Sequence, residues 1–334
     1  LTLYRHYIEV YYIPSSLREI VITDATGISA NAFYGCTMLT SITLNEGITA
    51  IYSRAFYNCD GLTEMVIPEN VTSIGSYAFA ESSNLAKVML PSVLTKITDC
   101  TFQNCVSLAS VNGNGEVVIG ANVTSIGSST FAGCVSVGKV TLPNGLAEIG
   151  SSAFSGVTSL TQINIPASVT EIGASAFADC ANLVRINSDT DGKVILPEGL
   201  AEIGGSAFRN LGKITEVVIP NSVTSIGAGA FQGCNALVKM TLPFVGGSRS
   251  TNTSAEKTIR TTWDGGSRYL FGYIFGGETY QCSSGSSDST IVYTGSVPAG
   301  TTYQGASSYG DSYKSGSLTL YRHYIEVYYI PSSL

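Results

Sequence analysis

Apolar residues recur along most of the chain in a unit of 23 residues that fits neither one helix nor one strand. Polar residues stand mostly between the apolar positions, which in the unit spanning 62–84 are Leu62, Met65, Ile67, Val71, Ile74, Ala78 and Phe79. This spacing is too irregular for the 3.6-residue period of a helix and too long for the two-residue alternation of a single strand. It predicts a chain that winds around a core once in each unit.

The unit recurs nine times when the chain is aligned on one phenylalanine per unit. These residues are Phe33, Phe56, Phe79, Phe102, Phe131, Phe154, Phe177, Phe208 and Phe231. The gaps between them are 23, 23, 23, 29, 23, 23, 31 and 23 residues. Insertions of 6 residues near 112–120 and 8 residues near 188–194 therefore interrupt an otherwise constant period. The nine phenylalanines are the predicted structural core.

Each unit contains one predicted short strand, such as residues 65–67, followed by proline. Pro68 and Pro166 end this strand because proline has no N–H group to donate. The recurring Ile-Gly pair is expected to permit a bend, since glycine has no Cβ. No single unit can bury its own apolar edge, so neighbouring units must stack with their strands in parallel. The predicted fold is mainly β: a solenoid of about nine 23-residue repeats.

The repeat resembles the BspA-like, treponemal-type leucine-rich repeats of bacterial and protist surface proteins. Its core, V-T-S-I-G-x-x-A-F-x-x-C-x-x-L, occurs in full at Val223–Leu237, and its first part, through the phenylalanine, occurs at Val71–Phe79. Three units replace the column cysteine, with Ser82, Val157 and Leu211, and two replace the alanine before phenylalanine, with Thr101 and Thr130. The resemblance covers Leu17 to about Pro243. It implies a leucine-rich-repeat fold and a role in adhesion or extracellular structure, and it carries no shared catalytic residues.

The first 17 residues, LTLYRHYIEVYYIPSSL, recur letter for letter as residues 318–334. We therefore expect the chain to be one period of a longer tandem array, or a unit of an assembled filament. Leu17 and Leu334 occupy the first position of the repeat consensus, which predicts that they form the joint between units. The expected domains are 1–16 (end of a preceding connector, duplicated at 318–333), 17–243 (solenoid) and 244–334 (connector and cap).

Residues 244–316 are rich in Gly, Ser, Thr and Tyr and lack the repeat. Alternating aromatic and small residues, as in 269–277 and 290–295, predict short antiparallel strands. A flexible Gly/Ser linker is the alternative, although Trp263 and the dense aromatic residues argue against it. We expect a small β-rich connector that caps one solenoid and leads into the next, because an exposed terminal strand is an unpaired sheet edge.

Composition excludes two classes of partner. The net charge is −7 and only 12% of residues are charged, which argues against binding nucleic acid or an anionic membrane surface. No apolar run reaches the length of a membrane span, and no signal peptide is evident in this segment.

The reactive side chains favour structural interpretations. Six of the eight cysteines occupy one column, where small buried side chains are a better interpretation than disulfides or a metal site: Cys36, Cys59, Cys105, Cys134, Cys180 and Cys234. Cys100 and Cys282 lie outside this column, and the sequence leaves open whether they are free or paired.

Other candidate chemistry is weak. His6 and His323 are one position of the duplicated segment, with no nucleophile or orienting acid beside them. Residues 189–192 partly match a calcium loop but lack its sixth-position glycine and twelfth-position glutamate. Glycosylation motifs occur at Asn70, Asn122 and Asn252, the first two within the repeat consensus. No catalytic, cofactor or metal residue is predicted.

The outward strand positions carry mixed charges and no aromatic stripe, so no small-molecule pocket is predicted there. The chain is therefore expected to be a non-enzymatic extracellular protein that forms a fibre, stalk or filament with copies of itself end to end. The alternative is a surface adhesin that binds a protein or glycan on another cell through the solenoid.

Overall fold

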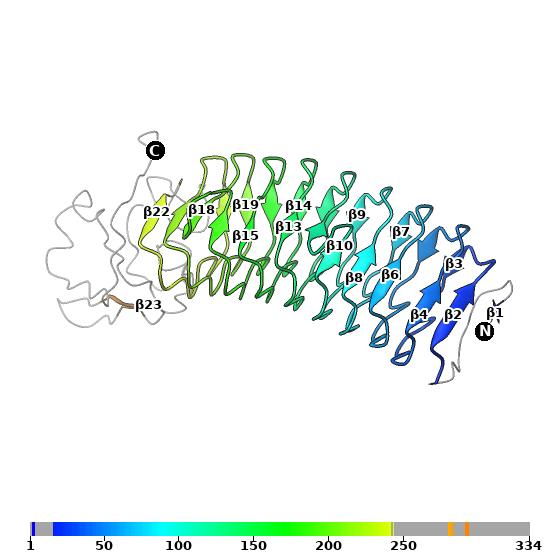
Figure 1. The fold of residues 1–334 in the computed structure, drawn as a ribbon. Coiled ribbons are helices and arrows are strands. Elements are labelled where there is room, and N and C mark those ends of the chain that lie inside the picture. The colour runs from blue at the N-terminus through cyan, green and yellow to red at the C-terminus, as the bar shows by residue number, and fades with distance from the viewer. Residues whose placement is uncertain (1, 4–15, 242, 244–279, 283–290, 294–334) are drawn as a thin grey trace, which may run out of the picture.

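The chain winds into one elongated stack of strands, turns and loops (Figure 1). The computed structural model describes residues 2–3, 16–241, 243, 280–282 and 291–293, and no helix occurs among them. Successive units lie side by side in chain order, from β2 (Glu19–Ile22) at one end to β22 (Lys239–Thr241) at the other. The predicted solenoid of 23-residue repeats is confirmed.

The first strands of successive units pair in parallel in two sheets, one joining β2 to β4 (Ser41–Thr43) and one running from β6 (Glu64–Val66) to β22, and together these strands form the first row. Pairing is in register: Met65 of β6 lies opposite Val88 of β8 (Lys87–Met89). The other members are β10 (Ser110–Val111), β11 (Val117–Val118), β13 (Val140–Thr141), β15 (Gln162–Ile163), β17 (Arg185–Ile186), β18 (Lys193–Ile195) and β20 (Glu216–Val218).

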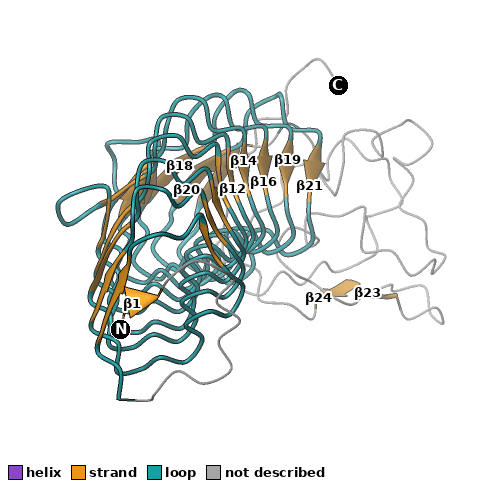
Figure 2. Ribbon diagram, turned by 90° about the vertical axis from the view of Figure 1, so that its right-hand side faces the viewer, coloured by secondary structure: helices purple, strands orange, loops and turns teal. Residues whose placement is uncertain are grey.

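A second row of strands, which the sequence did not predict, lies on another side of the stack (Figure 2). Each strand in it has two residues and ends on the isoleucine of the Ile-Gly pair or its equivalent. The members are β3 (Gly27–Ile28), β5 (Ala50–Ile51), β7 (Ser73–Ile74), β9 (Lys96–Ile97), β12 (Ser125–Ile126), β14 (Glu148–Ile149), β16 (Glu171–Ile172), β19 (Glu202–Ile203) and β21 (Ser225–Ile226).

The repeated glycine directly precedes a turn and is also required by close packing between units, a reason that the sequence did not reveal. A Cβ on Gly75 would lie 2.4 Å from the backbone nitrogen of Ser53, in the preceding unit. At Gly173 the corresponding distance, to the nitrogen of Ser151, is 2.5 Å. Real Cβ atoms do not approach so closely. Glycine therefore lets the backbones of adjacent units touch at the end of the second row.

Both insertions add a strand to the first row and none to the second. The first insertion lies between β10 and β11, which pair in parallel, and the second lies between β17 and β18. At each insertion an asparagine adopts a left-handed backbone conformation, Asn112 at φ 51° and Asn187 at φ 49°, and the chain turns away from the preceding strand. Its side-chain oxygen accepts a hydrogen bond from the preceding unit, from Leu90 N (2.6 Å) or Ile165 N (2.7 Å). The asparagine side chain thus takes the place of a strand carbonyl.

Two further pairings involve the segments outside the repeats. Strand β1 (Thr2–Leu3) pairs in parallel with β2, with Thr2 opposite Val21 and Leu3 opposite Ile22. Strands β23 (Tyr280–Cys282) and β24 (Ile291–Tyr293) form an antiparallel pair within the region for which such strands are predicted. Trp263, residues 269–277 and the second copy of the duplicated segment, 318–334, lie outside the described residues.

Candidate interaction surfaces

The nine phenylalanines form a continuous stack through the centre of the solenoid. Each has 0% of its surface exposed. Consecutive rings lie 5.2–5.7 Å apart between centroids, with interplanar angles of 4–18°. Leu17, the expected joint residue, is partly buried and packs against the same core, whereas Leu334 lies outside the described residues. These buried rings fill the centre of the described units.

Tight turns place each phenylalanine inside. The residues two before and two after it both adopt left-handed conformations, as at Arg54 (φ 56°) and Asn58 (φ 54°) around Phe56. The chain therefore reverses direction on both sides of the inward-pointing ring. Most occupants of these positions are Ser, Asn or Gly; Glu81 (φ 62°) and Tyr77 (φ 61°) are among the exceptions.

Within the described residues, five of the six column cysteines donate a hydrogen bond from their unit to the previous one. Cys180 Sγ donates to the carbonyl oxygen of Phe154 at 3.0 Å. The same bond occurs at Cys59, Cys105, Cys134 and Cys234, with distances of 3.0–3.1 Å. In the unit where serine replaces cysteine, Ser82 Oγ donates to Phe56 O at 3.0 Å. The interpretation as small apolar residues is therefore incomplete, because the thiols also satisfy buried carbonyls.

Burial keeps these thiols protonated and therefore unreactive. Desolvation raises the pKa of Cys59, Cys134, Cys180 and Cys234 from 9.0 to about 12, so the reactive thiolate is absent near neutral pH. All seven cysteines between residues 36 and 234 are free, including Cys100. The side chain of Cys282 lies outside the described residues.

The first row carries outward charges that pair across neighbouring strands. Glu216 lies between Lys193 (3.3 Å) and Lys239 (3.1 Å). Burial acts to raise the pKa of Glu216, but hydrogen bonds from Lys239 and Lys193 outweigh it and lower that pKa. Lys139 pairs with Glu116 at 2.6 Å in the same manner. Glu116 belongs to the first insertion, which thus supplies a partner charge as well as a strand.

The second row instead carries like charges. Glu148 lies opposite Glu171, and Glu171 opposite Glu202, on three adjacent parallel strands. All three side chains are exposed, and no ion pair links them to a lysine or arginine within the described residues. Like charges directly opposite each other destabilise a sheet. This acidic ladder is a solvated surface whose repulsion the core must offset.

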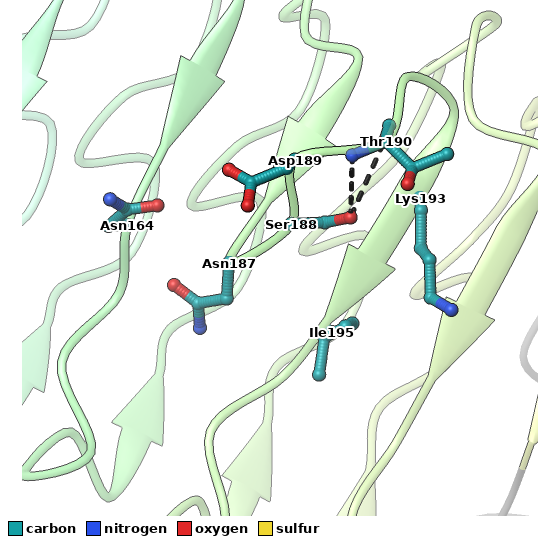
Figure 3. Close-up of a pocket in the computed structure, with 7 residues that line it drawn as sticks. All are labelled: Asn164, Asn187, Ser188, Asp189, Thr190, Lys193 and Ile195. Carbon is teal, nitrogen blue, oxygen red and sulfur yellow. Dashed lines mark hydrogen bonds between the residues drawn. The ribbon is translucent and has the colours of Figure 1, made fainter.

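A shallow polar depression of about 610 Å³ lies beside the second insertion (Figure 3). Its lining is Asn164, Asn187, Ser188, Asp189, Thr190, Lys193 and Ile195. Ser188 Oγ accepts a hydrogen bond from Thr190 N at 3.1 Å, which holds the loop closed on itself. Asp191, the second carboxylate of the partial calcium motif, pairs with Arg185 at 3.3 Å. No group of three metal-ligating side chains occurs within the described residues.

Exposed and partly exposed tyrosines lie on or next to the turns near the first units, a feature that inspection of the strand positions did not reveal. The rings of Tyr34 and Tyr57 stack with centroids 4.8 Å apart and an interplanar angle of 7°. Arg54 lies 5.0 Å above the ring of Tyr77, and Tyr52, two residues before Arg54, is 56% exposed. We call these five residues the tyrosine cluster. Tyr34 and Tyr57 both follow the column phenylalanine directly, which is the signal in the sequence.

Two of the three candidate glycosylation asparagines link neighbouring units by hydrogen bonds. The side-chain amides of Asn70 and Asn122 donate to backbone carbonyls of the preceding unit, at Glu46 (2.8 Å) and Ser92 (2.9 Å). Asn252, His6 and His323 lie outside the described residues. In the part of the chain that the structure describes, no helix is long and apolar enough to cross a membrane.

Comparisons with solved structures find other bacterial leucine-rich-repeat proteins. A Bacteroides ovatus leucine-rich-repeat protein is 23% identical, with a TM-score of 0.45, covering 67% of this chain and 73% of its own. The leucine-rich-repeat protein of T. pallidum is 28% identical, with a TM-score of 0.44 and coverages of 65% and 82%. A leucine-rich cell surface protein from Faecalibacterium prausnitzii is 24% identical, with a TM-score of 0.38 and coverages of 73% and 82%. No curated protein matches the chain.

The repeat itself gives the family. Residues 8–118, 114–237 and 190–254 match the BspA-type leucine-rich-repeat region, a profile of six copies. These matches span most of the chain and include every column phenylalanine. The chain belongs to the BspA-type leucine-rich-repeat family.

Proposed function

We propose that the chain is a non-enzymatic structural protein of the cell surface that forms a fibre, stalk or filament from copies of itself joined end to end. The observation that carries this proposal is the perfect recurrence of residues 1–17 at 318–334. Selection for a single compact domain gives no reason to repeat 17 residues without change. A joint that recurs once per unit does require the same sequence each time.

The stack supports an architectural role. Each row consists of two parallel sheets that follow the units in chain order. The phenylalanine stack runs through all nine units. A solenoid of this kind gains length by adding units, and each unit contacts only its neighbours. Placement outside the cell and lack of catalysis are proposed from the family, whose repeats are typical of surface proteins and share no catalytic residues.

Electron microscopy of material from the native source tests the proposal. We expect negative-stain images to show elongated particles of varied length with a regular axial repeat. Images that contain only isolated single solenoids would overturn it. The reading frame around the chain separates the two forms of the proposal: continuation after Leu334 with Arg-Glu-Ile-Val indicates a covalent tandem, as at residues 18–21 after Leu17.

The tyrosine cluster favours adhesion as a second function. Exposed aromatic rings beside an arginine are suited to contact a protein or the apolar face of a sugar. Glycan-array and cell-binding measurements with the native chain and the Tyr52→Ala/Arg54→Ala variant test this. Binding that is lost in the variant supports adhesion through the cluster, and equal binding by both proteins rejects that site.

A further inference from the structure

We propose that residues 318–334 donate a strand to a second copy of the chain. In this joint Thr319–Leu320 of one copy replaces Thr2–Leu3 at the edge of β2 in the second copy, in the register that Thr2–Leu3 has within one chain. The inference rests on the proposed function and identifies the contact by which copies join.

The recipient is the terminal strand of the first row. On one side β2 pairs with β4 over three residues, with Ile20 opposite Ile42. On the other side its only partner within the described residues is β1, through Thr2 opposite Val21 and Leu3 opposite Ile22. A sheet edge covered by two residues is an available template for an added strand, because its backbone groups need partners.

The recipient also presents two distinct faces. Ile20 and Ile22 point into the core and are 1% and 2% exposed, whereas Val21 between them is 39% exposed. An incoming strand must therefore match this alternation as well as the backbone spacing, since a slip of one residue exchanges the two faces. In the pairing of β1 with β2, Thr2 lies opposite the outward Val21 and Leu3 opposite the inward Ile22.

The donor is residue-for-residue the segment that already occupies the site. Because residues 318–334 repeat residues 1–17 without change, Thr319–Leu320 can form every contact that Thr2–Leu3 forms. Exchange of identical elements between copies costs little, since the contacts are conserved. The donor comes from one end of the sequence and the recipient from the other. Such a head-to-tail contact generates an open chain of subunits when the rotation between copies does not close a ring.

Strand exchange predicts concentration-dependent oligomers of the chain of residues 1–334. The copy at 2–3 competes for the edge from within the same molecule, so dilution favours single chains. Light scattering after size-exclusion chromatography over a hundredfold range of concentration measures this. We expect mass to rise with concentration without a fixed upper limit. A constant monomer mass over this range for the native chain and for the released-edge variant below would overturn the proposal.

Two paired variants identify the donor. Alternate residues of a strand direct their N–H groups to opposite sides, so both residues are replaced by proline, which has no N–H group. Thr319→Pro/Leu320→Pro removes the donor, leaves residues 2–3 intact, and should give monomers at all concentrations. Thr2→Pro/Leu3→Pro releases the edge of β2 and should increase the oligomeric fraction at least several-fold. Oligomers that persist without the donor would reject strand exchange while leaving the fibre function intact.

Cross-linking between two populations of the full chain tests the register. Chains with Val21→Cys are mixed with chains that carry Thr319→Cys, and a short bismaleimide is added to the oligomers. Mass spectrometry should identify a link between positions 21 and 319. Val66→Cys is the matched control, because Val66 is also an outward first-row position, 65% exposed. Equal linkage at 66, or oligomers without the 21–319 link, would contradict the proposed register.

Discussion

The two strand rows share one core and one period, yet they respond differently to insertion. In the first row, β10 and β17 are each followed by an added strand, and pairing continues through it. The second row gains no strand from either insertion. Ser125 of β12 pairs directly with Lys96 of β9, although the first insertion lies between them in the sequence. The solenoid therefore accepts an extra strand in the first row, while the second row keeps one strand per unit.

Close contact explains this difference. A Cβ on Gly127, just after β12, would lie 2.6 Å from the backbone nitrogen of Asp99, although the first insertion separates the two residues. Backbones packed this closely leave no room for an added strand. In the first row, by contrast, the chain can turn at Asn112 and return beside itself, because the asparagine side chain replaces the missing carbonyl. The second row and the phenylalanine stack thus set the spacing of the units.

Removing one ring from the shared core should have the largest effect. Phe154 stacks between Phe131 and Phe177, 5.5 Å from each. We expect Phe154→Ala to lower the free energy of unfolding by about 3–5 kcal/mol, because a buried cavity remains. Urea denaturation followed by circular dichroism measures the loss. Phe33→Ala, which removes a ring with one described stacking neighbour, should cost less; equal losses would show that the stack does not act as a continuous column.

Adding a methyl group at the end of a second-row strand should have the next largest effect. Gly173→Ala places a Cβ 2.5 Å from the nitrogen of Ser151, so adjacent units must separate. We expect a loss of about 1–3 kcal/mol in unfolding free energy. Gly145→Ala is the matched control, because a Cβ added there would meet no atom within 4 Å. Similar midpoints for both variants in urea would contradict the role of the second row as the tight side.

The 23-residue period of apolar positions predicts much of this fold, including the phenylalanine column and the first-row strands. The second row could not be found in the same way. Ser73–Ile74 is two residues long, and alternation of apolar and polar residues needs about four to eight residues to indicate a strand. Its glycine is informative only once the neighbouring unit is in place, since the contact from Gly75 to Ser53 spans 22 residues of sequence.

The candidate surfaces were less predictable, for related reasons. The partner of each column thiol is a backbone carbonyl, which has no residue identity to recognise. One clue exists, because Ser82 stands in the cysteine column and shares with cysteine the ability to donate a hydrogen bond. The tyrosine cluster lies on turns rather than strands, so a search of outward strand positions passes over Tyr34 and Tyr52.

A smaller effect, and one that depends on pH, is expected from a thiol in the cysteine column. The pKa of Cys180 is raised from 9.0 to about 12 in the folded chain. The unfolded chain therefore releases this proton first, and the thiol's stabilisation is complete below pH 9 and is lost as pH rises toward 12. Each pH unit in this window costs about 1.4 kcal/mol per thiol.

Cys180→Ser isolates this contribution, because the hydroxyl still donates to Phe154 O but does not titrate. At pH 7 we expect the variant to lie within about 1 kcal/mol of the native chain. Between pH 9 and 10 the native chain should lose more stability than the variant does, as measured by urea denaturation at each pH. Parallel losses would mean that the Cys180 thiol is not protected by folding.

The smallest effects should have opposite signs on the two rows. Glu171→Gln removes the central charge of the Glu148–Glu171–Glu202 ladder, so the second row should gain about 0.5 kcal/mol in unfolding free energy. Glu216→Gln removes a charge held between Lys193 and Lys239, so the first row should lose about 0.5 kcal/mol. Urea denaturation at low ionic strength measures both changes. Because salt screens exposed charges, both should shrink in 0.5 M NaCl, a salt concentration chosen to be about tenfold above the low-salt condition. If the two substitutions changed stability in the same direction, the charge patterns of the rows would not be what distinguishes them.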